Sequence, residues 1–490
     1  MSLKSRTISG VSWSALARYL SQGIQLGLAV LLMRLLSPEA YGLLAMAMVL
    51  IGFADALKGM GLKSALVQKH DPTPRQTSTV FWFVLLFSTC LTALFVGAAP
   101  YAAEFFGEPN LTGIVQWLSL LFVLGTVGIV PRSGLEKEMR FYALAKVDVA
   151  SVAMSGIVAT TMAFTGWGVW SLVAQRLVQV TSKNVLVWGY STWRPGAQFS
   201  FTAAKELIQY GGNLTGFNMV NRLARAGDDL LIGKFMAAGS LGIYNRAYRL
   251  MMLPIKKVIR AVSDVLFPAL SAIKDDEERV RRIFLRTIRA ISFLTFPMMM
   301  GLIVVADVFV LALLGSKWES AIPIIRILCV ASLVQTLANP TGWIYRSQGR
   351  TNWMFRWGLV GSTTLLGAII LGVYLGSIES VALCYTVANV LILYPVLTIP
   401  GWLIDMSFMD VMRAVCGNFA AALTMAGGVY ALGLSIPAVW PSWIVLALQV
   451  GVGMGLYWGI AHVCNLSAYG ELLEIGKERW NALRKSRAAT

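Results

Sequence analysis

Long apolar runs recur along the whole chain, and they constrain its fold more than any other feature. About fourteen runs of roughly twenty residues are separated by short polar turns. Because a helix needs about 20 apolar residues to cross a bilayer, the pattern predicts an all-α, polytopic integral membrane protein with about 14 transmembrane helices. The expected spans lie at roughly 11 to 36, 39 to 62, 77 to 103, 110 to 131, 142 to 165, 167 to 190, 206 to 234, 240 to 270, 285 to 314, 320 to 344, 353 to 376, 379 to 400, 411 to 433 and 441 to 464.

Charge alternates from one loop to the next. The chain holds 41 Lys and Arg against 24 Asp and Glu, a formal net charge of +17. Most loop cations fall in every second loop, from Lys4 to Arg487, whereas Glu104, Glu108 and Glu379 fall in the other loops. Cytoplasmic loops carry the excess of Lys and Arg in membrane proteins, so we expect both termini to be cytoplasmic. This bias explains most of the net charge, and no nucleic-acid partner is expected.

The first two spans have a counterpart later in the chain. The segment LLMRLLSPEAYGLLAMA, which begins at Leu31, overlays LLIGKFMAAGSLGIYNRA, which begins at Leu230. At an offset of two hundred residues, Gly42 meets Gly242. Internal repeats of this kind build many transporters, with the substrate path between the halves. The alternative is that two unrelated helical hairpins have similar composition.

Polar side chains follow one helical face on three of the expected spans. The main members are Arg18, Gln22 and Gln25 on the first span, Arg222, Arg225 and Asp229 on the seventh, and Arg249, Lys256 and Arg260 on the eighth. A cation at the bilayer centre costs about 2.5 to 3.5 kcal/mol, so such faces are expected to line a bundle interior or a watery cavity. The structural alternative is that these groups pair internally or extend to the headgroups.

An excess of cations in a cavity implies an anionic substrate. Guanidinium groups offer forked donors that suit phosphate oxygens, and they would repel a cationic drug. The candidate substrate-binding residues are Arg18, Arg222, Arg225, Arg249 and Arg260, and the candidate cavity or gating residues are Gln22, Gln25, Asp228, Asp229, Arg246 and Lys256.

Spans seven and eight are expected to form a hairpin whose turn centres near Ala237. Antiparallel helices then place Asp228 level with Arg246. We expect these two residues to pair and to fix the hairpin as one rigid unit, because an uncompensated buried charge is costly.

No motif of a familiar enzyme site is present. The chain has no phosphate-binding G-x-x-x-x-G-K-[ST], no H-E-x-x-H, and only two histidines, His70 and His462. Its five cysteines lie far apart in apolar segments, which fits neither a metal site nor a disulfide framework. No catalytic residue, cofactor or metal is expected. A membrane glycosyltransferase or polymerase stays open as an enzyme alternative, although the short loops do not favour it.

Several long segments together resemble the bacterial polysaccharide transporter family. They include LLSPEAYGLLAMAMVLIGFADALKGMGLKSALVQ, WGVWSLVAQRLV, DDLLIGKFMAAGSLGIYNRAYRLMMLPI, VLFPALSAIKDDEERVRR and LLGSKWESAIPIIRIL. The chain is most similar to exporters of the WzxC and teichuronic-acid type within the multidrug/oligosaccharidyl-lipid/polysaccharide superfamily. The resemblance runs from the first span to about the twelfth.

This resemblance implies two pseudo-symmetric six-helix lobes plus two C-terminal helices. The corresponding ranges are 1–195 for the N-lobe, 196–402 for the C-lobe, and 403–490 for spans thirteen and fourteen with a cytoplasmic tail. It also implies that a central cavity opens alternately to each side and carries undecaprenyl-diphosphate-linked oligosaccharide across the bacterial inner membrane. The resemblance also implies that five arginines line this cavity, namely Arg18, Arg222, Arg225, Arg249 and Arg260.

The implied partners are the lipid-linked oligosaccharide diphosphate, membrane lipids, and the glycosyltransferases and polymerase of the same pathway. The alternative within the superfamily is a cation-coupled multidrug exporter, which needs acids inside the membrane. Asp55, Asp148, Asp264 and Asp307 keep that alternative open.

Overall fold

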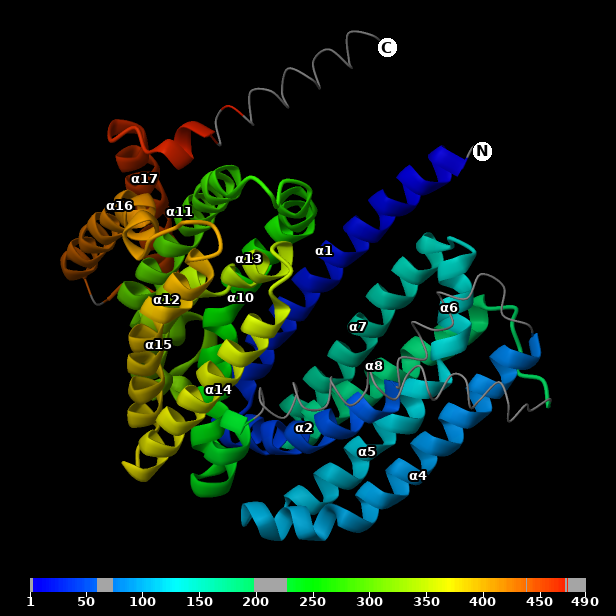
Figure 1. Ribbon diagram of the computed structural model, residues 1–490. Coiled ribbons are helices and arrows are strands. Elements are labelled where there is room, and N and C mark those ends of the chain that lie inside the picture. Colours follow the sequence, from blue (N-terminus) through cyan, green and yellow to red (C-terminus); the bar gives the residue numbers. More distant parts are fainter. Residues whose placement is uncertain (1–2, 60–73, 198–226, 438, 472–473, 475–490) are drawn as a thin grey trace. The chain divides into compact units, whose positions relative to one another are not determined.

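The computed structural model describes residues 3–59, 74–197, 227–437, 439–471 and 474 (Figure 1). Long helices dominate these ranges, and they contain no strand. Every expected span except the seventh coincides with a helix or a broken pair of helices. Of the seventh, residues 227–235 are helical and the preceding part lies outside the described residues. The all-α fold is therefore as predicted.

The chain divides into two compact units, residues 1–242 and 243–490. The predicted boundary between the lobes, at 195/196, precedes a segment of which residues 198–226 lie outside the described ranges, so it stays a prediction. The helices that belong wholly to the first unit are α1 (Leu3–Leu35), α2 (Pro38–Gly59), α4 (Pro74–Phe106), α5 (Leu111–Val127), α6 (Ile129–Lys137), α7 (Phe141–Phe164) and α8 (Val169–Tyr190).

Within the first unit, α7 packs along both α1 and α8 (Figure 1). A second group packs around α5, which contacts α2, α4 and α8. The side chains of Met46, Leu118 and Phe122 are fully buried in this part of the core. Burial of such apolar side chains inside the bundle fixes which face of each helix is left for the cavity or the lipid.

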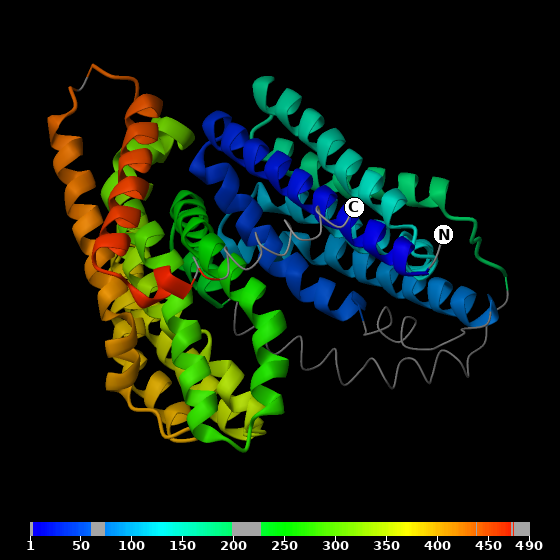
Figure 2. The ribbon, with the colours of Figure 1, turned by 90° about the horizontal axis from the view of Figure 1, so that it is seen from above.

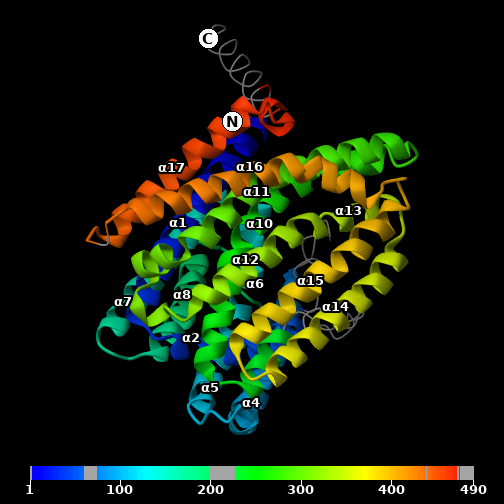
Figure 3. The same cartoon turned by 90° about the vertical axis from the view of Figure 1, so that its left-hand side faces the viewer.

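Helix α10 (Ala238–Ala272) begins in the first unit and continues into the second. The other helices of the second unit are α11 (Glu277–Phe309), η1 (Val310–Leu314), η2 (Ser316–Trp318), α12 (Ala321–Ala338), α13 (Thr341–Ser347), α14 (Thr351–Tyr374), α15 (Ile378–Gly401), α16 (Phe408–Ser435) and α17 (Ser442–Val463). Figure 3 shows α14 beside α15, and Figure 2 shows the orange and red helices α16 and α17 side by side.

The two C-terminal helices are tied to α11 by side chains that reach its backbone. Asn418 of α16 donates to the carbonyl of Arg289 at 2.8 Å, and Tyr457 of α17 donates to that of Phe293 at 2.9 Å. A capping box between Ser407 and Asp410 starts α16. Spans thirteen and fourteen therefore pack on the second unit through α11.

A break in the fourth span recurs in the tenth span. α5 gives way to α6 at Gly128, and α12 gives way to α13 next to Pro340. Both short helices end at a residue with positive φ, Met139 at 54° and Gly349 at 68°. In both, the next residue donates its backbone N–H to a carbonyl five positions back, from Arg140 to Leu135 at 3.0 Å and from Arg350 to Tyr345 at 2.8 Å. The same kind of turn also follows other helices of the described ranges, at Gly107 and Gly166 among them, so it is a common helix end and does not by itself mark a repeat.

The repeated hairpins also meet at matching glycines. A Cβ on Gly42 would lie 1.7 Å from the carbonyl oxygen of Ala238, and one on Gly242 would lie 1.9 Å from that of Pro38. Because Gly42 has no side chain, the backbone at Ala238 can approach α2 closely. Gly242 likewise lets the backbone at Pro38 approach α10. The pairing of positions 42 and 242 noticed in the sequence corresponds to a reciprocal contact in the structure.

Nine helices of the described ranges are long and apolar enough to cross a membrane. Helices α1, α8 and α10 are not among them, because polar side chains interrupt their apolar surfaces. Such a helix is stable in a bilayer only if its polar face is turned away from lipid. Two of these three helices line the cavity described next.

Candidate functional site

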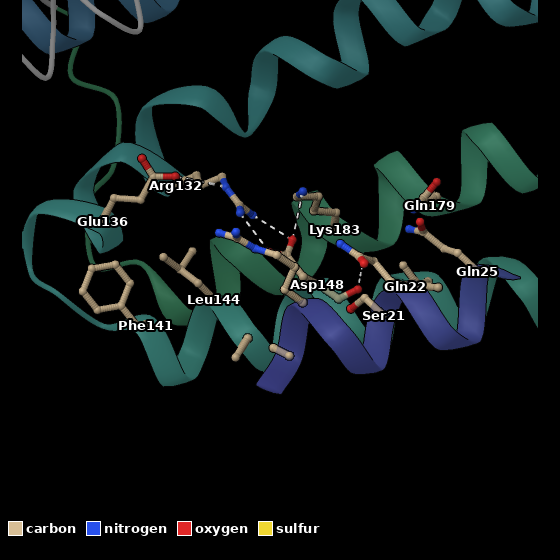
Figure 4. A pocket seen from close by; sticks show the side chains of 15 residues that line it. Ser21, Gln22, Gln25, Arg132, Glu136, Phe141, Leu144, Asp148, Gln179 and Lys183 are labelled. Atoms are coloured by element: carbon tan, nitrogen blue, oxygen red, sulfur yellow. Dashed lines mark hydrogen bonds and ion pairs between the residues drawn. The ribbon is translucent and has the colours of Figure 1, made fainter. Parts of the chain in front are cut away.

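A polar cavity of about 470 Å³ lies among α1, α6, α7 and α8 of the first unit (Figure 4). Its charged lining consists of three cations and two acids, which leaves a formal net charge of +1. The remaining polar lining consists of Ser21, Gln22, Gln25, Ser151 and Gln179. Charged and amide groups from four helices thus line one polar cavity of a size that can hold a ligand.

Asp148 of α7 is at the centre of the charged lining. Its Oδ1 and Oδ2 accept from the two terminal nitrogens of Arg132 at 3.0 and 2.9 Å, which is a bidentate pair. The Nζ of Lys183, on α8, lies 2.9 Å from Oδ1. Arg132 also contacts Glu136, one turn further along α6, at 3.3 Å. Figure 4 shows the dashed contacts of Arg132 and Lys183 converging on Asp148.

Local structure explains how Arg132 enters the cavity. α5 gives way to α6 at Gly128, and α8 side chains bind the end of α5. Asn184 donates to the carbonyl of Leu124, and Trp188 donates to that of Val127 at 3.0 Å. Carbonyls at the end of a helix lack partners within the helix, so these bonds stabilise the break. Arg132 then lies one turn past the break.

The predicted polar face of the first span lines this cavity. Arg18, Gln22 and Gln25 all belong to its lining, with Ser21 beside them. In Figure 4 the labelled side chains Gln22 and Gln25 extend from α1 into the same space as Asp148. The structure therefore brings these three candidates together, and their role in binding a substrate stays a prediction.

The other candidates divide into two groups. Arg222 and Arg225 lie outside the described residues. Arg246, Arg249, Lys256 and Arg260 lie on α10, where the last three are exposed and Arg246 is half-buried. These four residues are not among those that line the amino-terminal cavity.

The expected hairpin turn lies where the sequence predicted it. The helical residues 227–235 end two residues before α10 begins at Ala238. Asp228 and Asp229 are half-buried in the first helix of that hairpin. Asp228 belongs to the first unit and Arg246 to the second, so their pairing stays a prediction.

The sequence prediction missed Arg132, Glu136, Gln179 and Lys183. Arg132 was counted among the cytoplasmic loop cations, whereas it lies on a helix with a side chain only 23% exposed. Gln179 and Lys183 are spaced four residues apart, so they share a face of α8, and that spacing was an available signal. Asp148 had been considered only as an acid of a drug exporter.

Among the described residues, no three His, Cys, Asp or Glu side chains gather as a metal ion would require. The five cysteines are free thiols, of which Cys329 is buried. The cations, acids and amides that line the cavity offer ionic contacts and hydrogen bonds to a polar ligand.

Comparison with known proteins shows relatives over most of the chain. The sequence model of the family described as "Polysaccharide biosynthesis protein" matches residues 31–323. The teichuronic acid biosynthesis protein TuaB of Bacillus subtilis (strain 168) is 28% identical over 438 residues, 89% of this chain and 90% of its own length. The lipopolysaccharide biosynthesis protein WzxC of Escherichia coli (strain K12) is 27% identical over 441 residues, 89% of each chain. The succinoglycan biosynthesis transport protein ExoT of Rhizobium meliloti (strain 1021) is 28% identical over 380 residues, 77% of each chain.

Two solved structures share the fold. The lipid II flippase MurJ in an inward closed conformation has a TM-score of 0.72 at 14% identity, covering 94% of this chain and 99% of that chain. An inward-facing multidrug resistance transporter of the MATE family has a TM-score of 0.60 at 14% identity, covering 79% and 94%. At such identities the likeness concerns the fold, and the function has to be argued from the site.

Proposed function

Because this chain belongs to the polysaccharide biosynthesis protein family, we propose that it moves a lipid-linked oligosaccharide diphosphate across the bacterial inner membrane by alternating access. The relatives compared above serve the synthesis of teichuronic acid, lipopolysaccharide and succinoglycan, and one of them is a transport protein. The flippase MurJ has the same fold. The chain is accordingly a multi-pass membrane transporter and not an enzyme.

The amino-terminal cavity is the observation that carries this proposal. Its net charge is positive, and it combines two arginines and a lysine with three glutamines. Guanidinium and ammonium groups suit the oxygens of a diphosphate, whereas amides and carboxylates suit the hydroxyl groups of sugars. A substrate with a charged diphosphate and a polar saccharide needs both kinds of partner inside the membrane.

A cation-coupled multidrug exporter is the competing function, since the MATE fold is shared. It requires carboxylates that are available to an ion or a cationic drug. Both oxygens of Asp148 are occupied by Arg132, and Asp307 accepts from Arg326 at 2.6 Å. The side chains of Asp55 and Asp264 lie outside the described residues. Asp148 and Asp307 are therefore paired with arginines, and this pairing does not favour a site for a coupling ion or a cationic drug.

The orientation proposed from the loop charges places both termini in the cytoplasm. The glycosyltransferases that build the oligosaccharide and the polymerase that consumes it would then act on opposite faces of the same membrane. Alkaline phosphatase fused after Glu108 is expected to be active, and the same enzyme fused after Arg140 inactive. The reverse pattern contradicts the orientation.

Loss of surface polymer in a deletion strain tests the function. The wild-type chain is expected to restore the polymer and to clear lipid-linked oligosaccharide that accumulates in the strain. Arg18→Ala should reach normal membrane levels and restore less than about a tenth of the polymer, because one charge-assisted contact is worth about 1.5 to 3 kcal/mol.

Arg282→Ala is the matched control, since this arginine is 72% exposed and pairs with Glu278 outside the cavity. It should export as the wild type does. Full export by Arg18→Ala would show that the cavity cation is dispensable.

A further inference from the structure

Asp148 bridges three helices through one carboxylate. Arg132 approaches from α6 and Lys183 from α8, while Asp148 itself belongs to α7. The bond to Arg132 uses both carboxylate oxygens in the geometry that a phosphate group also offers to a guanidinium. The two cations best placed to hold a diphosphate inside this cavity are thus already occupied by an anion of the protein.

We propose that Asp148 is an internal counterion, which the diphosphate group of the substrate displaces from Arg132 and Lys183. This inference rests on the proposed function and names the step by which that substrate would enter the site. Asp148 occupies the position of the ligand in the empty state. The incoming anion replaces it, so that both cations keep an anionic partner before and after the exchange.

Exchange of one anion for another avoids the largest electrostatic cost. Removing a carboxylate from a buried arginine without replacement leaves an uncompensated charge in a medium of low dielectric constant. A diphosphate that arrives as Asp148 departs keeps Arg132 and Lys183 paired throughout. A neutral glycolipid cannot make this exchange, so the arrangement selects for the charged linkage.

Access to the bridge supports this exchange. The side chains of Asp148 and Lys183 are 36% and 38% exposed, whereas that of Arg132 is 23% exposed. Gln22 and Gln179 line the same space and can accept or donate hydrogen bonds. The carboxylate can therefore leave the two cations without entering an apolar environment.

The exchange also links binding to the position of α6. Asp148 connects this short helix, which follows the break at Gly128, to α7 and α8. A diphosphate with two phosphoryl groups can span Arg132 and Lys183 in its place. Binding would then keep α6 and α8 joined, while it removes the ionic link of each to α7.

Inorganic pyrophosphate binding to the purified full-length protein tests the inference by calorimetry. Asp148→Asn removes the competing charge and keeps the size of the side chain, so Kd should fall by about tenfold or more. A purely structural role predicts the opposite, because damage to the site weakens binding. An unchanged or higher Kd for Asp148→Asn overturns the proposal.

Asp307→Asn is the matched control, because it breaks another arginine–carboxylate pair, that with Arg326, outside the cavity. Its Kd should equal that of the wild type. If Asp148→Asn does not fold, Lys183→Gln decides instead. It should raise Kd about tenfold, and wild-type binding by this variant overturns the proposal.

A parallel titration with farnesyl diphosphate identifies the source of the anion. A similar fall in Kd for both ligands in Asp148→Asn supports a prenyl-linked diphosphate. A fall in Kd for pyrophosphate alone overturns the assignment to the lipid. These binding results are independent of transport. Failure of export in the deletion strain would contradict the proposed function while leaving the counterion exchange measurable.

Discussion

Met139 adopts a left-handed backbone conformation, with φ of 54°, at the turn between α6 and α7. This turn lies between the helix that carries Arg132 and the helix that carries Asp148. The equivalent position of the other repeat is Gly349, with φ of 68°. A left-handed conformation costs a residue with a side chain about 1 to 2 kcal/mol, and glycine avoids that cost.

We therefore expect Met139→Gly to stabilise the protein by up to about 1 kcal/mol, because relief of backbone strain outweighs the greater entropy of glycine in the unfolded chain. The thermal midpoint of the purified protein in detergent should rise. Met139→Ala is the control, since it removes the side chain and keeps the strain. A lower midpoint for Met139→Gly than for Met139→Ala would contradict this explanation.

Individual site residues were predictable only where a stripe of polar residues marked the face of a helix. Arg18, Gln22 and Gln25 stood out in an apolar span, and they do line the cavity. Arg132 did not stand out, because it directly follows an apolar run and the sequence alone places it in a loop. The structure places it on α6, after the helix break at Gly128. Its partner Asp148 lies 16 residues further along the chain on a different helix, and no local pattern predicts that contact.

At the scale of elements, the spans were predictable and their breaks were not. Hydropathy predicts the fourth and tenth spans as single helices, whereas each contains a break, at Gly128 and next to Pro340. Such breaks depend on tertiary hydrogen bonds, as when Trp188 binds the end of α5. The π-helical turn at Val310–Leu314 is likewise unmarked in the sequence.

The contact between the repeated hairpins makes a second prediction. Gly42→Ala should destabilise the protein by about 1 to 3 kcal/mol or more, since its Cβ would overlap the backbone of Ala238. Gly242→Ala should produce a similar loss through Pro38. The measurement is the thermal midpoint together with the yield of monodisperse protein on size-exclusion chromatography.

Gly27→Ala is the matched control on α1, because nothing lies within 4 Å of the Cβ that it would add. Alanine favours a helix over glycine by up to about 1 kcal/mol, so this variant should be as stable as the wild type or more stable. Equal midpoints for the variants at positions 42 and 27 would contradict the close approach.

At the scale of the molecule, the chain divides into two compact units, residues 1–242 and 243–490, and the predicted repeat with its two six-helix lobes stays a prediction. The family resemblance noted in the sequence is confirmed by the family match, and the fold is shared with MurJ. The positions of Arg222 and Arg225 could not be compared with their repeat counterparts Gln22 and Gln25, because they lie outside the described residues. The symmetry of the polar faces therefore stays a prediction.

Translocation by the purified protein in liposomes tests the central claim most directly. Fluorescent undecaprenyl-diphosphate-linked oligosaccharide is placed in one leaflet, and a quencher that cannot cross the membrane reports its movement. The account predicts that the wild type exposes the lipid to the quencher, whereas Arg18→Ala does so at least about tenfold more slowly. It also predicts little movement of an uncharged glycolipid. Equal movement of the charged and uncharged lipids, or none of either, would contradict a cavity that selects the diphosphate.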